Sequence, residues 1–121
     1  PRLLLGKTAV GGGLIEFNHF EPEVRVIKKE TANMVQRMLA AVLEYGTGRE
    51  GQPGCKAAGK TGTVQNSEGQ DLPDHAWFAG YAPLSEPQYA VVVFCEKGAS
   101  GGKTAAPIFR KIVDKITTKL D

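Results

Sequence analysis

The chain has 121 residues, of which 41% are hydrophobic and 23% are charged, and this composition is typical of one small globular domain. Its formal net charge of +2 is too small to indicate nucleic acid as a partner, and no apolar run reaches the ~18 residues that a membrane-spanning helix needs. The chain starts with "PRLLLGKT" and without an initiator methionine, so we expect it to be a piece of a longer protein.

The first part of the chain is predicted to be an extended lead-in over residues 1–26, because short apolar runs alternate there with consecutive glycines. Two of these runs, "LIEF" and "VRVI", are candidate short strands. A helix is then predicted over residues 31–45, with Thr31 as its N-cap and Gly46 as its C-cap. Its apolar stripe at helical spacing consists of Met34, Val35, Met38, Leu39, Val42 and Leu43.

A three-stranded meander is predicted next, over residues 56–96, with polar turn-forming loops between strands at 56–65, 75–82 and 89–96. The third strand, "YAVVVFCE", is apolar at successive positions, which predicts a strand covered on both faces. After a glycine-rich loop, a final helix is predicted over 105–120, with Pro107 in the first turn, where proline is tolerated. The predicted fold class is therefore α+β, an antiparallel β-meander packed by helices.

The stretch "GCKAAGKTGT" matches two motifs that imply different chemistry. Its first part fits G-x-x-x-x-G-K-[ST], the loop that binds nucleotide phosphates between a strand and a helix. However, "GREGQP" before it is no strand, and "GTVQNSEGQ" after it is a poor helix and a reasonable strand. The run "AVVVFCE" resembles the acid-ending strand that holds magnesium in nucleotide hydrolases, but a parallel sheet would need crossover helices before it. The nucleotide-hydrolase interpretation is therefore disfavoured.

The last four residues, Lys60-Thr61-Gly62-Thr63, match the third active-site motif of penicillin-recognising serine enzymes. On an exposed edge strand, a lysine ammonium supplies positive charge where a substrate carboxylate and a nucleophilic serine meet. Gly62 lets a substrate backbone lie against the strand, and Thr63 offers both a hydroxyl and a backbone N–H. Strict alternation places Lys60 and Thr63 on opposite faces, so a twist or bulge is expected if both contact the substrate.

Four stretches follow one another along the chain: "AAGKTGTVQ", "HAWFAGYAP", "YAVVVFCEKG" and "GGKTAAPIFRKI". Together they resemble the C-terminal part of a class B penicillin-binding protein. The stretch "VIKKETANMVQRMLAAVLEYGTG" resembles the helix before the KTG strand of that family, so the resemblance covers about residues 21–120. It implies the C-terminal portion of the β-lactamase/transpeptidase-like fold, an antiparallel sheet flanked by helices with an inserted helical lobe.

The resemblance also implies a D,D-transpeptidase that cross-links peptidoglycan through a serine acyl-enzyme, at the extracytoplasmic face of the bacterial cell membrane. Its implied partners are a stem peptide ending in D-Ala-D-Ala and β-lactam antibiotics. No cofactor or metal is expected, and a membrane anchor is expected outside this chain.

The same resemblance implies a role for each residue of the motif. Lys60, Thr61 and Gly62 take the positions of the catalytic KTG motif, with Lys60 stabilising charge and assisting proton transfer. The Thr63 hydroxyl is implied to bind the terminal carboxylate of the substrate. The Thr63 backbone N–H is implied to be one oxyanion-hole donor, a role worth about 3–4 kcal/mol in serine hydrolases.

The two other motifs of the family are not found where they are needed. No S-x-N occurs, and the one S-x-x-K, from Ser100 to Lys103, lies after KTG. Two glycines between them oppose the helix that would bring both side chains to one face, so we expect Ser100 not to be the nucleophile. We therefore expect the chain to be inactive alone. Its expected partner is the N-terminal half of the same transpeptidase domain, which would pair with the otherwise exposed 89–96 strand.

The remaining notable side chains are interpreted as structural. Trp77 and Phe78 are predicted to pack in the sheet with opposite facings, and no acid is placed to orient His75. Cys55 and Cys95 fall at the first and the third strand of the meander, with a strand between, which puts them beyond the ~7 Å limit for a disulfide. They also lack metal-ligand spacing.

Other functions stay open at this level. A serine β-lactamase or a D,D-carboxypeptidase shares the KTG motif, although "GYAP" and "AAPIF" are more similar to the transpeptidases. A β-lactam sensor or non-catalytic penicillin-binding module would use acylation as a signal and not for turnover. A turnover assay with an intact upstream nucleophile would separate these functions.

Overall fold

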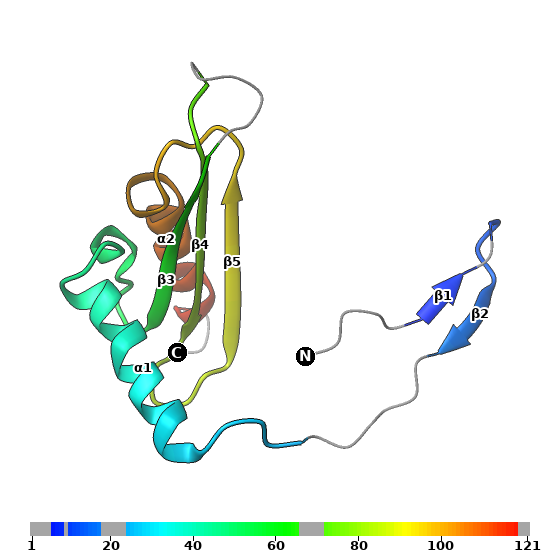
Figure 1. The fold of residues 1–121 in the computed structure, drawn as a ribbon, viewed down its shortest axis with the longest axis horizontal. Coiled ribbons are helices and arrows are strands. Elements are labelled where there is room, and N and C mark those ends of the chain that lie inside the picture. Colours follow the sequence, from blue (N-terminus) through cyan, green and yellow to red (C-terminus); the bar gives the residue numbers. More distant parts are fainter. Residues whose placement is uncertain (1–5, 9, 18–23, 66–71, 119–121) are drawn as a thin grey trace.

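The computed structural model describes residues 6–8, 10–17, 24–65 and 72–118. The elements follow in this order: β1 (Gly6–Thr8), β2 (Leu14–Phe17), α1 (Lys29–Glu44), the 3₁₀ turn η1 (Arg49–Gly51), β3 (Ala58–Val64), β4 (His75–Ala82), β5 (Tyr89–Cys95), the π-helical turn η2 (Gly101–Ala105) and α2 (Ala106–Thr117). Strands β3, β4 and β5 form one antiparallel sheet in that order. Helix α1 lies beside β3, and α2 packs on one face of the sheet (Figure 1).

The predicted α+β fold with an antiparallel meander is confirmed. Strand β4 has the predicted bounds, and β3 and β5 lie inside the predicted ranges. The strands pair without a register shift, with Gly62 opposite Trp77 and Phe78 opposite Val93. Within the described residues, β3 and β5 are the two edges of this sheet, so the KTG motif lies on an edge strand.

Helix α1 begins before the predicted helix. Lys28 occupies the N-cap position without a side-chain cap, and Glu30 lies in the first turn, where its charge suits the helix dipole. The prediction of Thr31 as N-cap is wrong, because good helix formers before it extend the helix. At the other end the cap position is Tyr45, one residue before the predicted Gly46.

The core lies between the sheet and α2. Phe78 of β4 and Phe109 of α2 are fully buried, and their ring centroids are 4.7 Å apart. Of the α1 stripe, Leu43 is buried in the core, whereas Met34 and Met38 are 59% and 60% exposed. The sequence therefore predicted the stripe, but only its C-terminal half is covered by the described residues.

The helical path to α2 starts earlier than predicted. Residues Gly101–Ala105 form the π-helical turn η2, where the sequence favoured a glycine-rich loop. The Ser100 side chain accepts a hydrogen bond from the Lys103 N–H and so caps this turn, which offsets the poor helix propensity of glycine. Pro107 lies in the first turn of α2, as predicted.

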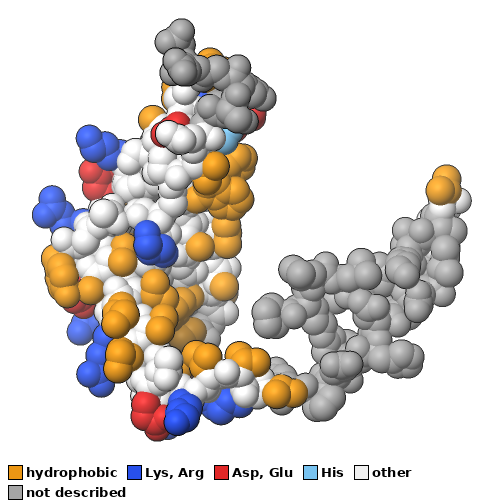
Figure 2. Space-filling model, in the orientation of Figure 1, with side chains coloured by type: hydrophobic (Ala, Val, Ile, Leu, Met, Phe, Trp, Pro, Cys, Tyr) orange, Lys and Arg blue, Asp and Glu red, His pale blue; other side chains and the backbone are white. Residues whose placement is uncertain are grey.

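The outer face of the sheet, opposite α2, is open. Alternation places Trp77, Val92 and Phe94 on this face, and they are 38%, 63% and 49% exposed. Figure 2 shows hydrophobic side chains gathered along the β5 side of the molecule. The prediction that β5 is covered on both faces is wrong for the described chain, because no described element lies over the outer face.

Of the two short strands predicted in the lead-in, one is confirmed and the other is wrong. The "LIEF" run forms β2, which pairs antiparallel with β1, with a register shift between Lys7 and Thr8. The "VRVI" run is irregular, with Val24 and Val26 exposed, because no strand among the described residues pairs with it. No helix in the described part of the chain is long and apolar enough to span a membrane.

Candidate active site

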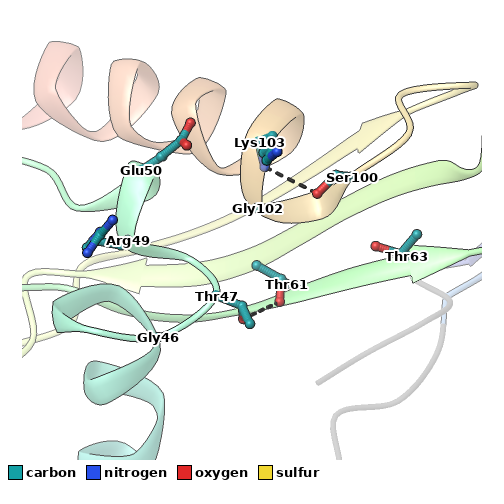
Figure 3. Close-up of a pocket in the computed structure, with 9 residues that line it drawn as sticks. All are labelled: Gly46, Thr47, Arg49, Glu50, Thr61, Thr63, Ser100, Gly102 and Lys103. Carbon is teal, nitrogen blue, oxygen red and sulfur yellow. Dashed lines mark hydrogen bonds between the residues drawn. The ribbon is translucent and has the colours of Figure 1, made fainter.

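A pocket of about 350 Å³ lies where β3, the α1–η1 turn and the β5–η2 turn meet (Figure 3). Its lining consists of Gly46, Thr47, Arg49, Glu50, Thr61, Thr63, Ser100, Gly102 and Lys103. Both threonines of the KTG strand therefore contribute to it. Segments far apart in the sequence supply the other walls, since η1 precedes the strand and η2 follows the whole meander.

The side chains of the KTG strand alternate between the two faces of the sheet. The pairing of β3 with β4 is regular through the motif, so alternation is preserved and the bulge considered from the sequence is absent there. Thr61 and Thr63 line the pocket on the α2 side, whereas Lys60 is exposed and lies outside the pocket. The Lys60 ammonium donates to the backbone carbonyl of Thr61 at 2.7 Å. A ligand that contacts both Lys60 and Thr63 must therefore lie along the free edge of β3.

The pocket hydroxyls are organised by hydrogen bonds. The Oγ1 atoms of Thr47 and Thr61 are 2.8 Å apart, which ties the α1–η1 turn to the KTG strand. The Gly101 N–H donates to the Thr63 Oγ1 over 3.5 Å, so the Thr63 hydroxyl proton remains available to an acceptor in the pocket. This wall therefore presents donors to a ligand.

The charges around the pocket favour an anion. Arg49 and Lys103 contribute two positive charges and Glu50 contributes one negative charge, and all three side chains are exposed. An arginine and hydroxyl donors are the groups that bind carboxylates well in proteins. The pocket is thus chemically suited to a carboxylate placed against the Thr61 and Thr63 hydroxyls.

Ser100 lines the pocket, but its local structure differs from that of a helical nucleophile motif. Its backbone is extended, with φ −141° and ψ 126°, and its Oγ accepts from the Lys103 N–H at 3.5 Å. The two glycines were predicted to oppose a helix, and this prediction is wrong, because they form the first turn of η2. Ser100 stands just outside that turn as its cap, and we still predict that it is not the nucleophile.

The other singled-out side chains have structural surroundings. His75 accepts the Lys97 N–H on Nδ1 at 3.1 Å and lies 5.6 Å from the Phe94 ring. The ring centroids of Trp77 and Phe94 lie 4.5 Å apart on the outer face, with the rings tilted by 43°, and Phe78 faces the core, so the predicted opposite facings are confirmed. Cys55 and Cys95 are free thiols. Among the residues that the structure describes, no cluster of His, Cys, Asp and Glu could hold a metal.

Sequence reasoning missed the residues that complete the pocket. Thr47, Arg49 and Lys103 carry no motif of their own, and tertiary packing alone brings them to the KTG strand. The one available signal was Thr47, which stands between two glycines directly after the predicted helix. A polar residue in such a turn marks a position where the chain reverses onto a neighbouring element.

The fold is that of the transpeptidase class of proteins, as solved structures show. Pseudomonas aeruginosa PBP2, in complex with WCK 5153, superposes with a TM-score of 0.70 and 31% identity, over 85% of this chain and 22% of that one. Penicillin-binding protein A from Mycobacterium tuberculosis, solved as a ceftriaxone acyl-enzyme complex, gives 0.65 and 28%, over 94% of this chain and 27% of that one.

The sequence identifies the family. The model of the penicillin binding protein transpeptidase domain matches residues 3–114, and this chain belongs to that family. It is 39% identical to Peptidoglycan D,D-transpeptidase MrdA from Haemophilus influenzae, over 57% of this chain and 13% of that protein. It is 34% identical to Penicillin-binding protein PbpB from Mycobacterium tuberculosis, over 93% of this chain and 19% of that protein. The chain thus spans less than a fifth of these relatives.

Proposed function

We propose that this chain supplies the KTG wall of a serine D,D-transpeptidase that cross-links peptidoglycan. The observation that carries the proposal is the geometry of β3, an edge strand with two threonines in a cationic pocket and Lys60 on its other side. The donor substrate is a stem peptide ending in D-Ala-D-Ala, which lies along the free edge of β3. Its terminal carboxylate meets the Thr63 hydroxyl, and its scissile carbonyl lies near the Thr63 N–H.

The reaction needs a serine from outside this chain. That serine attacks the penultimate D-alanine carbonyl, with Lys60 stabilising the negative charge that develops and assisting transfer of the serine proton. The Thr63 N–H is one oxyanion donor. The peptide bond then breaks and the terminal D-alanine leaves with that proton, which produces an acyl-enzyme. An amine of a neighbouring stem peptide attacks the ester, forms the cross-link and returns the serine.

The partner that supplies the serine is the N-terminal half of the same transpeptidase domain. Two features of the surface support this: β5 is an unpaired edge within the described chain, and the outer sheet face beside it is apolar and open. Exposed strand edges and large apolar faces are surfaces that proteins normally cover. The complete protein works at the extracytoplasmic face of the cell membrane, is held by an anchor outside this chain, and binds β-lactams in the same cleft.

The reaction class is tested by mass spectrometry of products formed by the chain combined with its upstream half. The substrate is a stem pentapeptide, supplied with an acceptor amine. We expect release of one D-alanine and formation of the cross-linked amide. Hydrolysis alone would make the protein a carboxypeptidase, a stable acyl-enzyme without turnover would make it a sensor, and absence of any acylation would refute the proposal.

The open sheet face gives a prediction about assembly. Changing both Trp77 and Phe94 to alanine is expected to weaken association with the upstream half by at least ~10-fold, because the double substitution removes the two aromatic side chains that anchor the interface. Association is measured by titrating the labelled upstream half. The control is Ile112→Ala on α2, since Ile112 has the same 38% exposure as Trp77 but lies away from the outer face. Equal effects of the two changes would contradict the assignment of this face.

The charged pocket gives a prediction about carboxylate binding. Lys103→Gln is expected to weaken, and Glu50→Gln to strengthen, the initial binding of a carboxylate-bearing penicillin, each by about 2–5-fold, the size of exposed charge interactions. Both effects should shrink as the salt concentration is raised. Binding before acylation is measured by stopped-flow kinetics. Effects of the same sign in both variants would show that the pocket charge does not act on the ligand.

A further inference from the structure

The turn between β5 and α2 touches the KTG motif directly. A Cβ atom at Gly101 would lie 2.4 Å from the Gly62 carbonyl oxygen and 2.5 Å from that of Trp77. It would also lie 2.9 Å from the Gly62 nitrogen. These are backbone atoms of paired strands, so no flexible side chain can move away to make room. Gly101 is therefore packed against Gly62, the last residue of the KTG motif, on the face opposite Lys60.

The neighbouring glycine makes a second close contact. A Cβ at Gly102 would lie 2.3 Å from the Thr47 carbonyl oxygen. Thr47 in turn is 2.8 Å from the Thr61 hydroxyl. The Gly101-Gly102 pair thus packs the η2 turn against β3 and against the α1–η1 turn, which are two walls of the pocket.

The turn itself is held by hydrogen bonds that do not depend on the KTG strand. The Ala99 N–H donates to the Asp74 carbonyl at 2.7 Å, which joins the turn to the start of β4. The Thr104 hydroxyl donates to the Gly98 carbonyl at 2.6 Å, and the Thr104 N–H donates to the Ser100 carbonyl at 2.9 Å. These hydrogen bonds fix the conformation of the turn, so it can hold β3 in position.

We propose that Gly101 is a positioning residue for the KTG strand, and that it acts on substrate through Thr63. This inference rests on the proposed function. The contact with Gly62 sets the position of the β3 edge, and the Gly101 N–H occupies a lone pair of the Thr63 hydroxyl. The hydroxyl proton is then directed to the carboxylate of the ligand. The class of ligand that this residue selects is one with a free carboxylate on the carbon bonded to the scissile amide nitrogen.

The test is the acylation rate of the chain combined with its upstream half, for a penicillin with its free carboxylate and for the methyl ester of the same penicillin. Gly101→Ala is expected to lower the rate for the free acid by at least ~10-fold, since small misplacements of binding groups have effects of this size or larger. The preference for the acid over the ester should fall with it. The control is Gly54→Ala, where a Cβ would meet only Asp114 Oδ1, at 3.7 Å.

Two further variants separate positioning from general loss of structure. Thr63→Val should abolish the same preference, and adding Gly101→Ala to it should have little further effect on that preference, because both act through one hydroxyl. Thr104→Val removes the hydrogen bond from the Thr104 hydroxyl to the Gly98 carbonyl and keeps nearly the same side-chain volume. Thr104 does not line the pocket, so this variant replaces Gly101→Ala in the test if Gly101→Ala does not fold. It should lower the preference in the same direction. An unchanged preference in both variants, or equal losses for acid and ester, would overturn the proposal.

A second readout does not depend on activity. In NMR spectra of the same assembly, Gly101→Ala should shift the amide resonances of residues 61–63, whereas Gly54→Ala should not. Shifts confined to residues 98–104 would overturn the positioning role. If the wild-type assembly reacts with no penicillin, the proposed function fails, and the amide shifts still decide whether Gly101 positions the strand.

Discussion

Lys60→Met is expected to lower the rate of penicillin acylation by about 10²–10³-fold, the usual effect of removing one electrostatic contact to a developing charge. The Lys60 ammonium is exposed at the strand edge and donates to its own neighbouring carbonyl at 2.7 Å, so it is free to exchange this bond for a substrate contact. Methionine keeps a similar length and apolar stem but removes the charge. The rate is measured with a chromogenic penicillin on the chain combined with its upstream half.

The matched control for this change is Lys56→Met. Lys56 is also exposed but lies before β3, and its carbonyl, which accepts the Leu84 N–H at 2.8 Å, is retained in the variant. We expect its acylation rate to stay within about twofold of the wild type, as for most surface changes. A loss in Lys56→Met as large as in Lys60→Met would show that general positive charge, and not the KTG position, drives acylation.

Phe78→Ala is expected to lower the free energy of unfolding by about 3–5 kcal/mol, the range for truncating a buried aromatic side chain. Phe78 is fully buried, and its ring centroid lies 4.7 Å from that of Phe109, with the two rings tilted by 43°. Glycines shape its site, because a Cβ at Gly59 would lie 2.5 Å from the ring and one at Gly48 would lie 3.0 Å from it. The cavity would therefore open below β3 and beside the turn that carries Thr47, so acylation should fall together with stability.

The stability effect is measured by chemical denaturation of the assembled domain. Ile108→Ala is the control, because Ile108 precedes Phe109 in α2 but is 38% exposed. We expect it to cost no more than about 1 kcal/mol, as is usual for partly exposed positions. Similar losses in the two variants would mean that the Phe78 and Phe109 pair is not the centre of the core.

The meander could be predicted from sequence because its signals are local. Turn-forming residues bound each strand, and the β-branched and aromatic residues of β4 and β5 favour extended backbone. The start of α1 could not be placed as well, because Thr31 is a good N-cap by type while the residues before it also favour helix. The covering of β5 depends on what lies over the outer face, and this is not encoded in the strand itself.

The candidate site could likewise be predicted only in part from the sequence. The KTG motif and the opposite facings of Lys60 and Thr63 followed from sequence, because a motif and alternation are properties of one strand. The contributions of Arg49 and Lys103 did not follow, since they depend on how η1 and η2 pack on β3. The closeness of Gly101 to Gly62 likewise arises between segments that only the folded meander brings together.

The central claim is that this chain supplies the KTG wall of a site whose nucleophile lies elsewhere. The most direct measurement is covalent labelling by a fluorescent penicillin, with the 121-residue chain alone and combined with the upstream half, followed by separation of the two chains. The account predicts no label on this chain in either case, and label on the upstream half only when Lys60 is intact. Stable label on this chain alone would show that one of its own serines, with Ser100 in the pocket as the first to examine, is the nucleophile.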